Sequence, residues 1–128
     1  MNFLLDTHTF IWWTMDQARL SSKARALMQD RENKLFLSHV SIWEIQLKTQ
    51  LGRLGLPLPL SDLVDEQQRQ NGIQLMPIQP RHIYALGQLA YHHTDPFDRL
   101  LIAQAITENL QMISADHVFP AYPLNLIW

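Results

Sequence analysis

The sequence contains no cysteine. Disulfides, thiolate zinc sites and cysteine nucleophiles are therefore excluded. Charge is also scarce: 17% of residues are charged and the net charge is -2 at pH 7, which argues against charge-driven disorder and against a strongly basic nucleic-acid surface. No apolar run approaches the roughly 18 residues of a membrane span, and the first residues, interrupted by Asp6, lack a signal-peptide pattern. We expect a cytoplasmic protein with no membrane segment.

Apolar residues, in contrast, are abundant. They make up 47% of the 128 residues, enough for one core, and a chain of this length usually forms one domain. We therefore expect a single domain over residues 1–128. If four of the 12 Asp and Glu held cations, eight acids would face ten Lys and Arg, and such a surface permits an anionic substrate.

Short apolar runs alternate with helical patterns along the chain. Strands are predicted at 3–5, 34–38, 73–78 and 111–114, with a further edge strand at 124–128. Helices are predicted after Asp6-Thr7, from Ser21-Ser22 to Met28, from Ser41 toward Leu51, from Ser61 to Gly72, from Pro80 with an apolar face of Ile83, Leu86, Leu89 and Ala90, and from Asp95 through Leu100 to Leu110. This alternation predicts an α/β fold with a parallel sheet.

Two helix starts carry specific signals. Ser41 and Glu44 fit a capping box, in which each side chain satisfies the other residue's backbone N–H. Asp95 precedes Pro96 as a helix cap, and Asp98 is then an acid in the first turn. Between the helices, residues 52–59 contain two Gly and two Pro, which predicts an irregular loop.

Four acids share one predicted edge of the sheet. Asp6 and Asp116 each follow a strand, whereas Glu44 and Asp98 lie in the first turns of helices. Ligands bind at this carboxyl edge in open α/β sheets. Carboxylates this close would repel one another unless they were protonated or neutralised by cations. An oxygen-only donor set suits Mg²⁺ or Mn²⁺, and two such ions about 4 Å apart can promote phosphodiester hydrolysis.

Each acid also has a purely structural interpretation. Asp6 is a plausible helix cap, Glu44 is explained by the capping box, Asp98 interacts favourably with a helix N-terminus, and Asp116 suits a turn. Capping acids collect at this edge of any α/β sheet. Location and chemistry alone therefore leave both interpretations open.

Four sequence blocks in order resemble the PIN-domain family of VapC-type toxins. They are LLDTHTFIWW (4–13), SIWEIQLK (41–48) followed by LGRLGLP (51–57), HHTDPFDRLLIAQA (92–105) and ISADHVFPAY (113–122). The resemblance implies a PIN-like three-layer α/β/α sandwich with a mainly parallel sheet of four to five strands. It also implies Mg²⁺- or Mn²⁺-dependent endoribonuclease activity, with Asp6, Glu44, Asp98 and Asp116 as catalytic and metal-binding acids.

The resemblance further implies an RNA substrate, a cognate VapB-type antitoxin and a homodimer or larger assembly. Asp95 is either an additional site acid or the helix cap, and we favour the cap. The exposed apolar stretch expected near 54–60 is a place for the antitoxin to bind.

Other residues near the acids are weaker candidates. His8, Arg99 and Lys48 could contact a phosphate, although solvated side chains are an equally good interpretation. The adjacent His92 and His93 lack the spacing of a helical metal site. Trp12, Trp13 and Trp43 could stack on RNA bases, but core or interface positions are more usual for such aromatics.

Two rival functions remain. A PIN-like interaction or regulatory protein without nuclease activity would keep the acids for folding alone. A phosphatase could use Asp6 as its nucleophile, but the second Asp expected two residues later is His8.

Overall fold

Five parallel strands form one sheet in the computed structural model, which describes all residues 1–128. The strand order is β3-β2-β1-β4-β5, and every neighbouring pair is parallel. The strands are β1 (Asn2–Leu5), β2 (Lys34–Ser38), β3 (Gln74–Met76), β4 (Gln111–Ile113) and β5 (Leu126–Ile127). All five predicted strands are confirmed, and β3 and β5 are shorter than predicted. The first strand is central, so the residue that follows it is flanked by two neighbouring strand ends.

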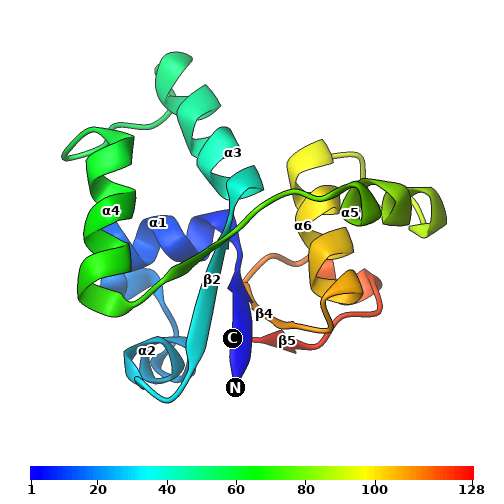
Figure 1. Ribbon diagram of the computed structural model, residues 1–128, viewed down its shortest axis with the longest axis horizontal. Coiled ribbons are helices and arrows are strands. Elements are labelled where there is room, and N and C mark those ends of the chain that lie inside the picture. The colour runs from blue at the N-terminus through cyan, green and yellow to red at the C-terminus, as the bar shows by residue number, and fades with distance from the viewer.

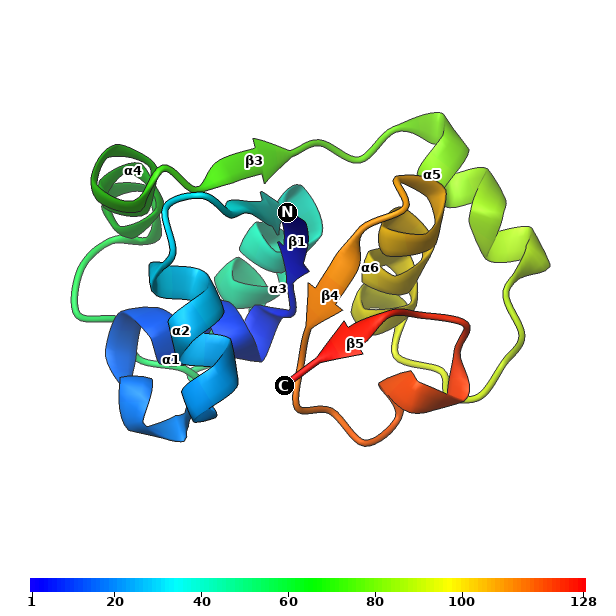
Figure 2. The ribbon, with the colours of Figure 1, turned by 90° about the horizontal axis from the view of Figure 1, so that it is seen from below.

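Helices cover both faces of this sheet. They are α1 (Thr7–Met15), α2 (Ser22–Gln29), α3 (His39–Gln50), α4 (Leu60–Asn71), α5 (Pro80–Ala85) and α6 (Pro96–Thr107). In Figure 1, α1, α2 and α4 lie on one side of the sheet and α5 and α6 on the other. Figure 2 gives the same division from a perpendicular direction. The predicted three-layer α/β/α sandwich is confirmed.

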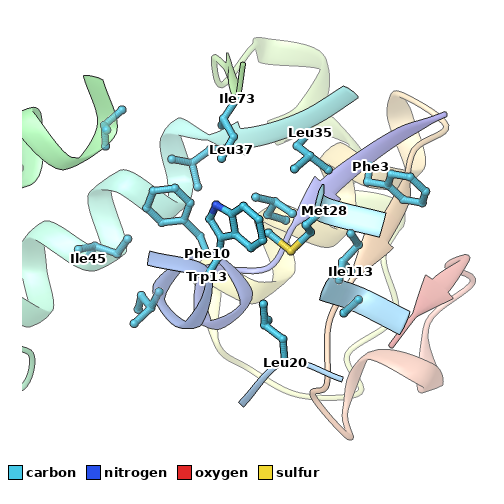
Figure 3. Packing of buried hydrophobic residues seen from close by; sticks show 14 residues of the cluster. Phe3, Phe10, Trp13, Leu20, Met28, Leu35, Leu37, Ile45, Ile73 and Ile113 are labelled. Atoms are coloured by element: carbon cyan, nitrogen blue, oxygen red, sulfur yellow. The ribbon is translucent and has the colours of Figure 1, made fainter. Parts of the chain in front are cut away.

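Alternating side chains of β1 enter two separate hydrophobic clusters. Phe3 and Leu5 are fully buried in the first, against α1, α2 and α4. Leu4 points the other way, into a second cluster with α6, as the period-two alternation of a strand requires. Figure 3 shows the first cluster, where Phe10 and Trp13 of α1 pack beside Leu37 of β2. Burial on both faces explains why the last three residues of the strand, Phe3 to Leu5, are all apolar.

The predicted caps of two helices are confirmed. The Ser21 hydroxyl accepts a hydrogen bond from the Ala24 N–H (3.0 Å) at the start of α2. At the start of α6, an Asp95 carboxylate oxygen accepts from the Asp98 N–H at 3.0 Å. Asp95 is exposed and acts as the cap.

The predicted capping box at Ser41 is wrong. Helix α3 begins three residues earlier, where the Ser38 hydroxyl accepts from the Val40 N–H (3.0 Å). Ser41 therefore lies inside the helix, and its hydroxyl pairs with Thr7 (2.9 Å). Glu44 moves from the first turn to the second, with its side chain free for another role.

The predicted apolar face of α5 is also partly wrong, because Ile83 is 50% exposed. The buried side chain of this helix is His82. Its Nδ1 accepts from the Gln79 N–H (3.0 Å), and its Nε2 lies 2.8 Å from a Glu108 carboxylate oxygen at the end of α6. A polar residue occupies the position because both ring nitrogens have partners.

None of the helices is both long enough and apolar enough to cross a lipid bilayer.

Candidate functional site

The four predicted acids come from the ends of β1 and β4 and from helices α3 and α6. Asp6 lies between β1 and α1, and Asp116 lies in the loop after β4. Glu44 is in α3 and Asp98 is in the first turn of α6. Figure 2 shows β1 entering α1 beside the neighbouring end of β4. Strand order therefore brings together acids that are up to 110 positions apart in the sequence.

Asp6 is at the centre of the group and is only 3% exposed. Burial raises the pKa of its carboxyl to about 7, and the charges of Asp116 and Glu44 act in the same direction. A hydrogen bond from the Ser114 hydroxyl to the Asp6 carboxylate (2.9 Å) opposes the rise. Ionised Asp6 is therefore costly unless positive charge reaches it.

Glu44 is 4% exposed and makes an ion pair with Lys48 one turn later, at 2.8 Å. The pair uses one carboxylate oxygen. The other oxygen, Oε1, is buried with no hydrogen-bond partner. Because buried polar atoms are nearly always paired, this oxygen is available to bind a ligand.

Asp98 is held by a histidine. Its carboxylate lies 3.2 Å from His93 Nε2, while His93 Nδ1 lies 2.7 Å from the Tyr122 hydroxyl. Burial raises the pKa of Asp98 to about 7, with further contributions from the charges of Asp95 and Asp6. Asp95 therefore acts on the site through its charge, while its side chain caps α6.

Ser114 connects the remaining acid to Asp6. Its hydroxyl donates to Asp6 and accepts from the Asp116 N–H (3.1 Å). The Asp116 carboxylate itself accepts from the Val118 N–H (2.9 Å). One buried hydroxyl thus fixes the relative positions of the two acids that follow adjacent strands.

Sequence reasoning missed these supporting side chains. Thr7 pairs with Ser41, Thr9 donates to the Ile113 carbonyl (2.8 Å), and His93 and Ser114 hold two of the acids. A signal was present, because small hydroxyl residues adjoin three of the acid motifs, in DTHT, SIWE and SAD. Their partners, however, depend on contacts between segments distant in sequence.

The acids are neighbours, but no three His, Asp or Glu side chains are arranged to ligate one ion. Each acid instead pairs with its own local partner, as described above. The donors are nevertheless carboxylate oxygens, which Mg²⁺ and Mn²⁺ prefer, and Glu44 Oε1 has no other partner. The donor set therefore suits a hard divalent cation.

The structure places the three weaker candidates in different environments. Arg99 is 4% exposed, and its guanidinium donates to the carbonyls of Leu89 and Ala90 and to the Tyr122 hydroxyl. Through these contacts, Arg99 holds the loop before α6, so the structure does not support the predicted contact between Arg99 and a phosphate. Lys48 is committed to Glu44 but is 32% exposed. His8 is exposed beside Asp6 and Asp116, and partial burial lowers its pKa, with the positive charge of Lys48 also contributing.

Comparison with known proteins gives matches along nearly the whole chain. A family model described as PIN domain matches residues 3–124. Ribonuclease VapC16 of Mycobacterium tuberculosis (strain ATCC 25618 / H37Rv) is 33% identical over 61 residues, which cover 48% of this chain but only 43% of that protein. Ribonuclease VapC22 of the same organism is 26% identical over 114 residues, covering 88% of this chain and 85% of that protein.

A solved structure has the same fold. It is the VapBC2 complex from Rickettsia felis bound to a DNA fragment from its promoter, which matches with a TM-score of 0.75. The match covers 99% of this chain and 98% of the other chain at 15% identity.

Proposed function

The chain belongs to the PIN-domain family, and from this premise we propose that it is a divalent-cation-dependent endoribonuclease that acts as the toxin of a VapBC-type pair. The observation that carries the proposal is the gathering of Glu44, Asp98 and Asp116 around the buried Asp6. The names of the ribonuclease relatives VapC16 and VapC22 support the reaction class. Purely structural roles for the acids do not explain why a Glu44 carboxylate oxygen is buried without a hydrogen-bond partner in this group of acids.

The four acids would hold one or two Mg²⁺ or Mn²⁺ ions. Such ions supply Lewis-acid stabilisation of a phosphodiester and a water of lowered pKa. Ser114 keeps Asp6 and Asp116 in register through its two hydrogen bonds. His93 restrains Asp98 through its Nε2 atom. Residues that hold carboxylate ligands in this way fix their orientation before substrate arrives.

Lys48 supplies the positive charge nearest to Glu44. When Glu44 turns toward a cation, the partly exposed ammonium group becomes free to contact an RNA phosphate. His8 is exposed beside Asp6. The chain itself thus contributes a group of desolvated carboxylates, with the positively charged side chain of Lys48 at the edge of that group.

RNA cleavage tests this proposal directly. We expect the protein to cut RNA with Mg²⁺ or Mn²⁺ and not with EDTA, and we expect Asp6→Asn to lower the rate at least ~100-fold while leaving the fold intact, because losing a direct ligand costs more than losing its supporting partner. Asp65→Asn, on the exposed side of α4, is the matched control and should cleave normally. Cleavage that persists in EDTA would contradict the mechanism.

The antitoxin partner is a separate part of the proposal. An open groove of about 470 Å³ is rich in leucine and is lined by Leu54 and residues 56–60, together with Gln46 and Thr49. Such a groove suits an apolar segment of a partner protein. Co-expression with a small protein encoded beside this chain should yield a complex that no longer cleaves RNA. Full activity in that complex would contradict the assignment.

A further inference from the structure

A hollow of about 270 Å³ opens directly beside two of the acids. It lies between the first two turns of α1 and the loop after β4, and its lining consists of Asp6, His8, Trp12, Ala115, Asp116 and His117. We refer to this space as the α1 hollow. The proposed nuclease mechanism uses the two carboxylates of this hollow and gives no role to its three aromatic side chains, His8, Trp12 and His117.

The structure distinguishes the three tryptophans that the sequence could not separate. Trp13 is buried, and its indole N–H donates to Gln67 (2.9 Å). Trp43 is 56% exposed and packs edge-on against Phe97, with ring centroids 4.8 Å apart. Trp12 is half-buried and, alone among the tryptophans, lines a space shared with Asp6 and Asp116.

Trp12 is held rigidly in the wall of the α1 hollow. The Trp128 ring packs against it at 5.7 Å, and the Arg19 guanidinium lies 5.1 Å from its ring centre. His8 is one helical turn earlier on the same face, and its ring is 5.9 Å from Trp12. Unlike Trp12, His8 is exposed, so its ring is open to a ligand. A rigid wall loses little conformational entropy when a ligand binds.

The shape and chemistry of this space suit a flat ring attached to an anionic group. Rings of His8, Trp12 and His117 stand next to carboxylates that would hold cations and, through them, a phosphate. We propose that the α1 hollow binds the nucleobase next to the cleaved phosphodiester, an inference that rests on the proposed nuclease function. A base paired in a duplex cannot enter such a space, so the substrate would be single-stranded or looped RNA.

Indole NMR signals test the inference without any cleavage. Metal-free protein in EDTA is titrated with adenosine, cytidine or uridine, which carry no phosphate for the bare acids to repel, and with ribose as the control. We expect the Trp12 indole N–H to shift with at least one nucleoside, together with its neighbour Trp128. Trp13 should remain still as an internal reference, because Gln67 holds it inside the core.

Two results would overturn the inference. In one, the Trp12 signal stays fixed at millimolar nucleoside or moves equally with ribose. In the other, only the Trp43 signal moves, which would place base stacking at the Trp43–Phe97 pair. A shift of the Trp12 indole signal with an arginine-containing peptide, but with no nucleoside, would also count against an RNA base as the occupant.

Variants separate this inference from the nuclease proposal. We expect His8→Ala to weaken nucleoside binding at least about fivefold, as expected for loss of one stacking contact. Trp12→Phe keeps an aromatic wall and should retain binding. Tyr84→Ala, at a 76% exposed aromatic on α5, is the control and should change nothing. If nucleosides fail to bind while Asp6→Asn still abolishes Mn²⁺-dependent cleavage, only the proposed base-binding site is wrong. If nucleosides bind but the protein never cleaves RNA, the proposed nuclease function is wrong instead.

Discussion

At the scale of single residues, Asp6 is the most revealing side chain. A carboxyl group that is 3% exposed and surrounded by other acids resists ionisation. Folding nevertheless places it there, with Ser114 as its only side-chain hydrogen-bond partner. The resulting destabilisation should be measurable in protein freed of divalent cations.

Stability should therefore fall as pH rises. Folding raises the pKa of Asp6 and Asp98 from an ordinary value of 3.8 to about 7, so the folded state holds more protons than the unfolded state between these values. The free energy of unfolding in EDTA should drop by on the order of 5 kcal/mol between pH 5 and pH 8, about half of it from each carboxyl group. Urea unfolding at several pH values measures it.

Asp6→Asn should remove a large part of this pH dependence, because asparagine keeps an oxygen for the Ser114 hydroxyl and never ionises. The variant should be more stable than the native protein at pH 8 and similar to it at pH 5. An unchanged pH dependence in the variant would show that Asp6 ionises freely in the folded protein.

The residue scale also marks where sequence reasoning ends. Asp6, Asp98 and Asp116 could be selected because each has a recognisable position at a strand end or a helix start. Glu44 was selected from a capping box that the helix does not form, because Ser38 caps α3. The support from Ser114 and His93 could not be selected, since these contacts join segments that meet only in the folded chain. Burial of Arg99 was likewise invisible, because an arginine beside an acid in sequence has no fixed direction.

At the scale of elements, Gln104 links the two helices that carry Glu44 and Asp98. It is fully buried on α6, and its carbonyl accepts from the Ser38 hydroxyl (2.5 Å) at the cap of α3. Its amide also donates to the Pro77 carbonyl (3.3 Å) after β3. This link keeps the start of α3 at a fixed distance from the middle of α6.

Replacing this residue with an apolar side chain of similar length should weaken the fold. We expect Gln104→Met to lower the free energy of unfolding by about 2 kcal/mol, because the buried Ser38 hydroxyl loses its acceptor. Thermal or urea unfolding gives the value. Gln68→Met, at an exposed position of α4, is the matched control, and an equal effect from both variants would exclude a specific role for Gln104.

Element boundaries followed from the sequence where a cap was locally sufficient. Ser21 and Asp95 are such cases, because each hydroxyl or carboxylate reaches an N–H three residues later. The start of α3 did not follow, since both Ser38 and Ser41 offer a cap. Ser38 ends β2, and Ser41 is drawn to Thr7 of α1 instead, a choice made by tertiary contacts.

At the scale of the whole molecule, the strand order explains why the acids meet. Placing β1 between β2 and β4 sets Asp6 beside the segments that carry Glu44 and Asp116. The alternation of strands and helices was enough to predict the sheet and its ligand-binding edge. The local partner of each acid was not predictable, because the folded chain alone brings Lys48, His93 and Ser114 to these carboxylates.

Manganese titration followed by NMR tests the shared site most directly. Below one equivalent, Mn²⁺ should broaden the backbone signals around Asp6, Glu44, Asp98 and Asp116 together, and Asp6→Asn should remove most of that broadening. Broadening centred on exposed acids such as Asp62 and Asp65 of α4, or the same broadening in both proteins, would contradict the claim that these four carboxylates hold a common cation.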